Sequence, residues 1–246
     1  MLAAMQETLP TVLVPGLVCS PRLFAEQIPA LWRFGPVAVA DHTRDDSMSG
    51  IARRLLADAP PRFALVGLSM GGYVALEVQR QAPNRVVKLA LLDTSARPDL
   101  PEQSEQRRRQ IELARGGRFG QIAGMLFPRL VAASHHGDQL LEAVVQTMAE
   151  ETGAEAFVRQ QTAIMQRVDS RPGLAAIRCP TLVVVGAEDA LTPPERAAEI
   201  AAGIPGARQV VVPDCGHLST LEQPQAVTRA LTEFLSGPVP RAATAA

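Results

Sequence analysis

The chain has 246 residues, of which 47% are hydrophobic and 20% are charged, and its formal net charge is -1 at pH 7. This length and apolar content predict one or two compact units with a substantial core. The near-neutral charge provides no broad basic field for nucleic acid, and no apolar stretch approaches the ~18 residues that cross a bilayer. Residues 1–7 lack the charged and apolar regions of a signal peptide, so we expect a cytoplasmic protein with no membrane or nucleic-acid partner.

Short apolar, β-branched runs alternate with helical patterns along much of the chain. We predict strands at residues 11–14, 36–40, 63–67, 87–92, 181–185 and 208–212. A helix is expected to begin after Ser47, and another is expected to begin at Pro193 with Thr192 as its cap residue. This alternation predicts an α/β fold whose mostly parallel sheet has about six strands, with ligands bound beyond their carboxyl ends.

The most informative segment follows the third predicted strand, where residues 67–71 read Gly-Leu-Ser-Met-Gly before a helical pattern. A strand that turns through Gly-x-Ser-x-Gly into a helix is typical of a nucleophile elbow. Gly67 and Gly71 lie where a Cβ would collide as strand backbone folds tightly into helix backbone. The pattern predicts that Ser69 is an exposed nucleophile, which requires a base and an oxyanion site nearby.

An acid and a histidine follow Ser69 at the ends of later strands. Asp189 lies just after the strand at 181–185, and His217 lies in the loop after the last strand. The order Ser, acid, His is one of the known orders of a catalytic triad, in which a neutral imidazole takes the serine proton. Asp93 also ends a strand and is the alternative acid. A histidine base predicts that kcat/KM rises with pH through an apparent pKa of ~6–7.

These motifs, together with Gly186-Ala187-Glu188-Asp189 and Gly216-His217, resemble the α/β-hydrolase superfamily. The segment Val-Leu-Val-Pro-Gly-Leu-Val at residues 12–18 is similar to the family's first oxyanion loop, with Pro15 where its members usually have His. The resemblance implies an oxyanion hole formed by the backbone N–H groups of Leu17 and Met70. Members often carry an N-terminal hairpin for which residues 1–10 are too few, so we expect a trimmed sheet.

Residues 99–172 interrupt the alternation with consecutive helical patterns, where the family inserts a helical cap. We therefore predict a core of residues 1–98 and 173–238, a cap of 99–172 and a flexible tail of 239–246. Several apolar cap residues are able to face the pocket, although each fits a helix core better; they are Met125, Leu126, Phe127, Met148, Phe157 and Met165. We predict a mainly apolar pocket that prefers uncharged acyl esters.

Other charged and polar groups have simpler explanations. Arg107, Arg108 and Arg109 form either an anion clamp or, as we expect, a solvated helix face in which Glu105 pairs with Arg109 and Glu112 with Arg108. Three further histidines lack an acid and a serine around them; they are His42, which is within reach of the pocket rim, and His135 and His136 in the cap.

No cofactor or metal is predicted. Lys88, the single lysine, approaches a strand, which disfavours Schiff-base chemistry, and neither a His-Glu-x-x-His motif nor a carboxylate cluster offers metal ligands. The three cysteines form no Cys-x-x-Cys pair and are expected to be reduced.

The sequence thus predicts a serine hydrolase that cleaves carboxylic esters of small to medium substrates through an acyl-enzyme. Within the superfamily the alternatives are a lactonase, resembling 3-oxoadipate enol-lactonases, and a carbon–carbon bond hydrolase. Outside hydrolysis, a ligand receptor or a lyase shares this fold.

Overall fold

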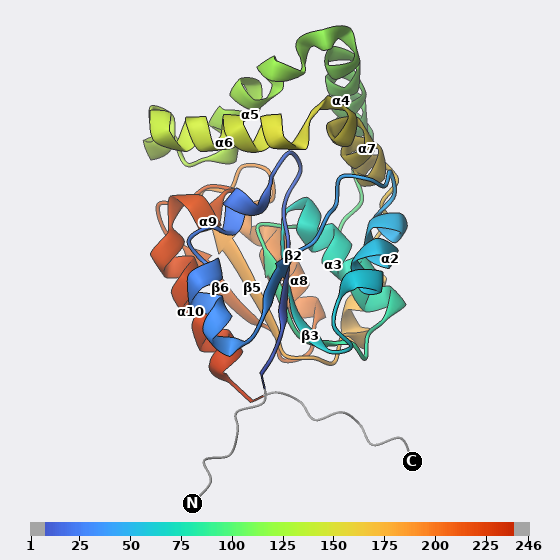
Figure 1. Ribbon diagram of the computed structural model, residues 1–246, viewed down its shortest axis with the longest axis vertical. Helices are drawn as coiled ribbons and strands as arrows, with labels where there is room; N and C mark the ends of the chain where they lie inside the picture. The colour runs from blue at the N-terminus through green and yellow to red at the C-terminus, as the bar shows by residue number, and fades with distance from the viewer. Residues whose placement is uncertain (1–7, 239–246) are drawn as a thin grey trace, which may run out of the picture.

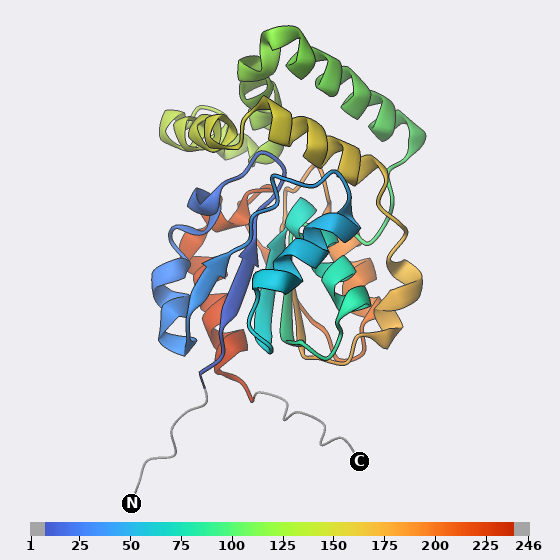
Figure 2. The same cartoon turned by 45° about the vertical axis from the view of Figure 1, so that its right-hand side comes forward.

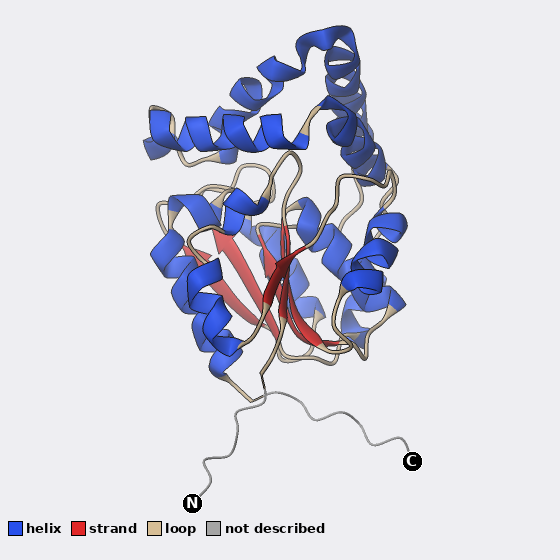
Figure 3. Ribbon diagram, viewed as in Figure 1, coloured by secondary structure: helices blue, strands red, loops and turns tan. Residues whose placement is uncertain are grey.

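The computed structural model describes residues 8–238, which form a parallel sheet between helices and a helical layer above it (Figures 1 and 3). The strands are β1 (Thr11–Val14), β2 (Val37–Val39), β3 (Phe63–Leu68), β4 (Val86–Leu92), β5 (Thr181–Gly186) and β6 (Arg208–Val212). The α-helices are α1 (Ile28–Leu31), α2 (Met48–Asp58), α3 (Met70–Gln81), α4 (Pro101–Leu113), α5 (Ile122–Leu130), α6 (Gln139–Thr152), α7 (Ala154–Met165), α8 (Pro194–Gly203), α9 (Ser219–Glu222) and α10 (Pro224–Ser236).

The six described strands lie in the order β2-β1-β3-β4-β5-β6, and each pairs with its neighbours in parallel. This confirms the predicted α/β class and its sheet. Each predicted strand lies within two residues of the observed one at both ends. The predicted tail at residues 239–246 and most of the segment judged too short for a hairpin lie outside the described residues.

Both faces of the sheet are covered because side chains alternate along each strand. Along β4, Ala90 and Leu92 belong to one apolar cluster, whereas Leu89 and Leu91 belong to the other. The first cluster contains residues of α10, and the second contains residues of α2, α3 and α8. Helices on two faces leave only the strand ends open to ligands.

Helices α4 to α7, which we call the cap, lie over the carboxyl ends of the strands (Figure 2). The last of these helices is followed by the chain segment that returns to β5. The side chain of Asp138 caps α6 by accepting hydrogen bonds from the backbone N–H groups of Leu140 and Leu141, both at 3.0 Å. The cap therefore encloses the edge of the sheet at which β3, β5 and β6 deliver the predicted site residues.

Lys88 has a structural role, because it joins β4 to the end of α10. Its Nζ donates hydrogen bonds to the carbonyl oxygens of Phe234, Leu235 and Gly237 at 2.7–2.9 Å. These bonds supply donors to carbonyl groups at the end of α10, where the last carbonyls of a helix lack a full set of intrahelical partners. The contacts tie β4 to α10 and occupy all three protons of the ammonium group.

Candidate active site

Ser69 lies on a sharp turn between β3 and α3. Its φ of 56° is in the left-handed region, which side chains other than glycine rarely adopt. An added Cβ at Gly67 would lie 2.2 Å from the carbonyl oxygen of Gly71, and one at Gly71 would lie 1.9 Å from that of Val14. The two glycines are therefore required by close backbone approach, as the elbow pattern predicts.

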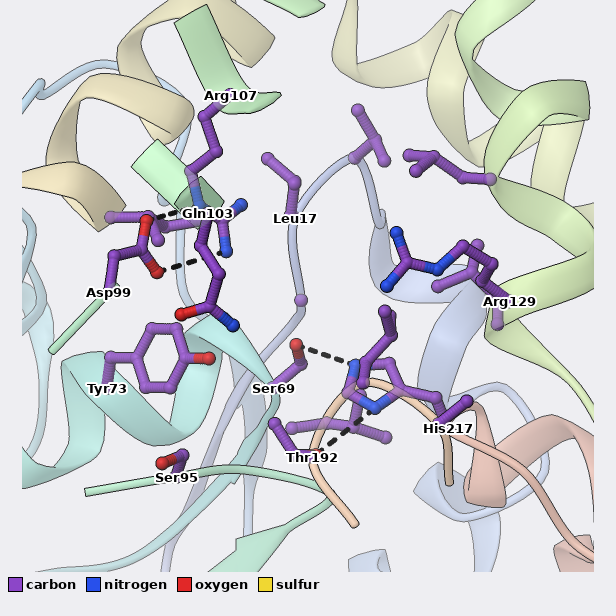
Figure 4. Close-up of a pocket in the computed structure, with 18 of the residues that line it drawn as sticks. Leu17, Ser69, Tyr73, Ser95, Asp99, Gln103, Arg107, Arg129, Thr192 and His217 are labelled. Atoms are coloured by element: carbon purple, nitrogen blue, oxygen red, sulfur yellow. Dashed lines mark hydrogen bonds and ion pairs between the residues drawn. The ribbon is translucent and has the colours of Figure 1, made fainter. Parts of the chain in front are cut away.

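The structure brings Ser69, His217 and Asp189 into one hydrogen-bonded chain. Nε2 of His217 lies 2.8 Å from Oγ of Ser69, and Nδ1 of His217 lies 2.8 Å from Oδ2 of Asp189 (Figure 4). His217 and Asp189 are buried, whereas Ser69 is partly accessible from the cavity. In this geometry a proton on Nδ1, bonded to the carboxylate, leaves Nε2 free to accept the serine proton.

Asp189 is held as an anion by several donors besides His217. Its Oδ1 accepts the N–H groups of Leu191 and Thr192 at 2.8 and 2.9 Å, and its Oδ2 accepts the Thr192 hydroxyl at 2.7 Å. Burial opposes ionisation, but the charge and hydrogen bonds of His217 and the bonds from Thr192 lower the pKa of Asp189 to about 2.

Thr192 was predicted to cap the helix that follows, and this prediction is wrong. Helix α8 begins at Pro194 with Pro193 as its N-cap residue and has no side-chain cap bond. The Thr192 hydroxyl bonds Asp189 instead and lies 3.3 Å from Nδ1 of His217. The Thr192 hydroxyl therefore stabilises the Asp189 carboxylate and does not cap the helix. Sequence patterns for helix starts do not distinguish these two uses of a threonine.

Asp93, the alternative acid, is buried near these three residues, and its side-chain hydrogen bonds go to residues other than His217. Its Oδ1 accepts the N–H of Gly186 at 2.9 Å, and its Oδ2 accepts the hydroxyl of Ser219. Burial, together with the charge of Asp189, raises the pKa of Asp93 well above its ordinary value. Its two hydrogen bonds join the end of β5 to α9, which immediately follows the His217 loop.

Of the two predicted oxyanion donors, Leu17 lines the same cavity as Ser69, and Met70 directly follows Ser69 as the first residue of α3. The backbone N–H groups of Leu17 and Met70 donate no hydrogen bond to any other described residue. An amide N–H without a protein partner beside a nucleophile is available to an oxyanion. Pro15 does not affect this arrangement because it removes only its own N–H.

The loop that carries Leu17 is fixed by residues that sequence reasoning did not assign. Val18 has a φ of 53°, and its N–H donates to Oε1 of Gln160 in α7 at 3.1 Å. On the other side, Nε2 of His42 donates to the carbonyl oxygen of Gly16 at 2.9 Å. Burial lowers the pKa of His42, which keeps the ring neutral with a proton on that nitrogen. His42 thus supports the loop and does not line the cavity.

Glu222 fixes the loop that carries His217. Its Oε2 accepts the N–H groups of Ala132 at 2.7 Å and Gly216 at 2.9 Å, and its Oε1 accepts the N–H of Leu218 at 3.0 Å. Ala132 lies shortly after α5, so this buried carboxylate joins the cap to the His217 loop. The sequence contains no local pattern that indicates such a contact.

We expect Glu222→Ala to lower the free energy of unfolding by about 2–5 kcal/mol, because it leaves the buried N–H groups of Ala132 and Gly216 without an acceptor. The midpoint of urea-induced unfolding measures this change. Glu222→Gln keeps one acceptor oxygen and is the matched control, with a smaller loss. An alanine variant that unfolds at the wild-type midpoint would contradict the role assigned to this carboxylate.

The pH dependence of hydrolysis follows from the surroundings of His217. Burial alone lowers the pKa of His217, but the negative charges of Asp189, Asp93 and Glu222 outweigh it, so the pKa lies above its ordinary value of 6.5. Because only the neutral imidazole accepts the serine proton, we expect kcat/KM to fall on acidification with a midpoint above 6.5. Initial rates with an uncharged ester test this, with circular dichroism at each pH as the control for folding. A midpoint at or below 6.5 would contradict it.

A cavity of about 260 Å³ lies between Ser69 and the cap. Ser69, His217 and Thr192 lie at its floor, and Gln103 and Arg107 of α4 and Arg129 of α5 extend into it from the cap (Figure 4). Five arginines line this cavity; they are Arg97, Arg107, Arg129, Arg167 and Arg196. The prediction of a mainly apolar pocket missed these arginines, because it overlooked the charged side chains that α4 and α5 direct into the cavity.

Most of the six apolar cap residues do not line the cavity. Leu126 lines the cavity, whereas Phe127, Met148 and Phe157 are buried in the first apolar cluster. Met125 is 58% exposed. Met165 is half-buried and, like His135 and His136, does not line the cavity.

The three consecutive arginines of α4 have different surroundings. Arg108 and Arg109 both pair with Glu105, at 3.2 and 3.4 Å, on an exposed face. The predicted pair of Arg108 with Glu112 is not formed. Arg107 is not solvated as predicted: it is 20% exposed, lines the cavity and pairs with Asp99 at 2.7 Å.

Among residues 8–238, no group of three or more His, Cys, Asp or Glu side chains is placed to hold a metal ion. No helix within the same range is long and apolar enough to cross a membrane.

Comparison with known proteins places this geometry in a family. The model of the alpha/beta hydrolase family matches residues 11–230. An esterase from Thermogutta terrifontis is 34% identical with a TM-score of 0.85, covering 93% of this chain and 89% of its own. The enol-lactonase from Burkholderia xenovorans LB400 is 25% identical with a TM-score of 0.85, covering 94% of this chain and 92% of its own.

A curated relative extends the same comparison. A putative carbamate hydrolase from Pseudomonas savastanoi pv. phaseolicola is 27% identical over 242 residues, which are 92% of this chain and 93% of the relative. The match of the family model over nearly the whole chain, joined to the parallel sheet and the serine turn after β3, determines the assignment. The chain is a hydrolase that belongs to the alpha/beta hydrolase family.

Proposed function

We propose that this hydrolase cleaves carboxylic esters of small to medium substrates, with Ser69, His217 and Asp189 as its catalytic residues. The observation that carries the proposal is the chain of two 2.8 Å contacts from Asp189 through His217 to Ser69 at the floor of the cavity. A carboxylate, an imidazole and a hydroxyl in this arrangement activate the hydroxyl for attack on a carbonyl carbon.

The reaction proceeds in two halves. Oγ of Ser69 forms a bond to the ester carbonyl carbon while Nε2 of His217 takes its proton, and the N–H groups of Leu17 and Met70 stabilise the oxyanion. The bond to the alcohol oxygen then breaks, and His217 returns the proton to that oxygen. A water molecule, deprotonated by His217, cleaves the acyl-serine and releases the acid. The balance is ester plus water to acid plus alcohol.

The surrounding residues position the groups that react. Asp189 holds the ring of His217 with the proton on Nδ1 and stabilises the imidazolium that forms during the transfer. Gln160 and His42 position the Leu17 loop, and Glu222 positions the His217 loop. We further propose that residues 99–172 act as one cap over a core of residues 1–98 and 173–238, and that the protein works in the cytoplasm on a small-molecule substrate.

A lactonase is the second candidate. The similarity to an enol-lactonase over 94% of this chain favours it, since a lactone is an internal ester that the same residues would open. The two candidates differ in the shape of the substrate and not in the residues that act on it.

A panel of carbonyl substrates tests the proposal. We expect the highest kcat/KM with p-nitrophenyl esters from acetate to octanoate, and lower values with γ- and δ-lactones and with p-nitrophenyl N-methylcarbamate. Buffer without protein gives the spontaneous rate of each substrate. A lactone with the highest kcat/KM would favour the second candidate, and catalysis of none of these substrates would contradict both.

A further inference from the structure

The lining of the active-site cavity is strongly cationic in a chain that is slightly acidic as a whole. Its described charged residues are the five arginines and one carboxylate, Asp99, although the whole chain has a formal net charge of -1. A cleft lined by one sign of charge concentrates its field and raises the local concentration of ions of the opposite sign. The cavity therefore favours an anion.

Most of this positive charge is already paired within the protein. Arg107 and Arg167 share Asp99, with contacts of 2.7 and 2.6 Å. Arg97 pairs with Glu199 at 2.7 Å. Arg107, Asp99 and Gln103 lie together on one side of the cavity (Figure 4).

The two remaining arginines differ in their surroundings. Arg196 lies near Glu199. Arg97 lowers the pKa of Glu199 most strongly, and the charge of Arg196 lowers it further. Arg129 makes no ion pair and no side-chain hydrogen bond with any residue in the described part of the chain. Its guanidinium group points into the cavity on the side of His217, away from the Arg107–Asp99 pair (Figure 4).

The backbone next to Arg129 is fixed relative to the catalytic histidine. The carbonyl oxygen of Leu130 accepts the N–H groups of both His217 and Leu218 at 3.0 Å. Two residues further on, the N–H of Ala132 donates to the same Glu222 carboxylate that holds Gly216. Two hydrogen bonds thus join this short segment of the cap to the His217 loop directly, and a third joins it through Glu222 of α9, so the backbone beside Arg129 is anchored next to His217.

We propose that Arg129 determines substrate specificity by binding a carboxylate that the ester carries away from the scissile bond. This rests on the proposed ester hydrolysis and names its substrate class, a carboxylate-bearing ester. A guanidinium group matches a carboxylate with two parallel N–H···O bonds, a geometry that Arg97 already uses on Glu199. For the half-ester anion of a dicarboxylic acid, the balance is half-ester plus water to dicarboxylate, alcohol and one proton.

Matched pairs of esters test the proposal on both halves of the substrate. The first pair is monomethyl adipate and methyl hexanoate, whose acyl chains have the same length. The second is 4-acetoxybenzoate and 4-methylphenyl acetate, which place the carboxylate in the alcohol part. We expect the wild-type protein to prefer the anionic member of at least one pair in kcat/KM, by about tenfold or more.

Variants of Arg129 assign this preference to one side chain. We expect Arg129→Gln to reduce the ratio of anionic to neutral kcat/KM by about 10- to 100-fold, mainly through KM, and Arg129→Lys to retain part of it. Arg108→Gln is the control, since Arg108 pairs with Glu105 outside the cavity and its loss leaves the ratio unchanged. An unchanged ratio in Arg129→Gln, with normal turnover of the neutral ester, would overturn the assignment and leave ester hydrolysis standing.

A binding measurement separates this inference from the proposed chemistry. Titration calorimetry of monomethyl adipate and 4-acetoxybenzoate into the Ser69→Ala variant reports affinity without turnover. We expect Kd for the favoured anion to rise by about tenfold or more when Arg129→Gln is added to that variant. A wild-type protein that hydrolyses no ester would contradict the proposed function alone. Equal Kd values with and without Arg129 would overturn the anion site alone.

Discussion

Replacing Ser69 by Ala is expected to lower kcat for ester hydrolysis by about 10⁶-fold while the protein stays folded. The variant loses the hydroxyl oxygen that lies 2.8 Å from Nε2 of His217, so no acyl-enzyme forms. The oxyanion N–H groups and the cavity remain, and they account for the small residual rate. Initial rates with p-nitrophenyl butanoate measure the loss, and urea unfolding checks stability.

A second serine variant shows that this loss is specific. Ser134 lies exposed in the cap, outside the cavity, so Ser134→Ala should keep the wild-type rate. The Ser69→Ala variant keeps the backbone φ of 56° and its strain, so its stability should change little. Ester hydrolysis at the wild-type rate by the Ser69 variant would contradict the proposed nucleophile.

Replacing Asp189 by Asn is expected to lower kcat by about 10⁴-fold. The two backbone N–H groups that donate to Oδ1 require an oxygen at that position, so the new NH₂ group must face His217. An NH₂ donor on that side favours the imidazole with its proton on Nε2, which no longer accepts the proton of Ser69. Single-turnover rates with a p-nitrophenyl ester measure the step affected.

Asp93→Asn is the matched comparison, and we expect it to lower kcat by less than about tenfold. An amide at this position keeps an oxygen toward the N–H of Gly186 and directs its NH₂ group to the hydroxyl of Ser219, which rotates to accept it. The two variants remove one carboxylate each from the same buried region, so they differ chiefly in contact with His217. A larger loss in Asp93→Asn than in Asp189→Asn would assign the orienting acid to Asp93.

The strands and the serine turn could be predicted because their causes are local. Short β-branched runs such as residues 181–185 have few structures available to them other than a buried strand. Gly67 and Gly71 are fixed by a turn that involves only their near neighbours and β1. The positions of Asp189 and His217 follow from the parallel sheet, which collects the carboxyl ends of its strands at one edge.

The supporting contacts could not be predicted because they join residues that are far apart in the sequence. Gln160 reaches Val18 across 142 positions, and Glu222 reaches Ala132 across 90. Thr192 carries a valid helix-start pattern, and only the position of Asp189 shows that its hydroxyl is used elsewhere.

The cavity lining was misjudged for a related reason. Arg107 and Arg129 lie on helices whose orientation over Ser69 is set by tertiary packing, so their sequence spacing does not reveal which side faces the substrate. The apolar residues of α5 and α6 were more visible in the sequence, but they form the core of the cap.

The central claim is that Ser69 forms a covalent bond during the reaction, and labelling with a fluorophosphonate tests it most directly. The reagent transfers a phosphonyl group only to a serine that a nearby base has activated, and proteolysis followed by mass spectrometry locates the adduct. We predict one adduct per chain on the peptide that contains Ser69, and none in the Ser69→Ala variant. An adduct on another serine, or an unlabelled Ser69 in a protein that hydrolyses esters, would contradict the account.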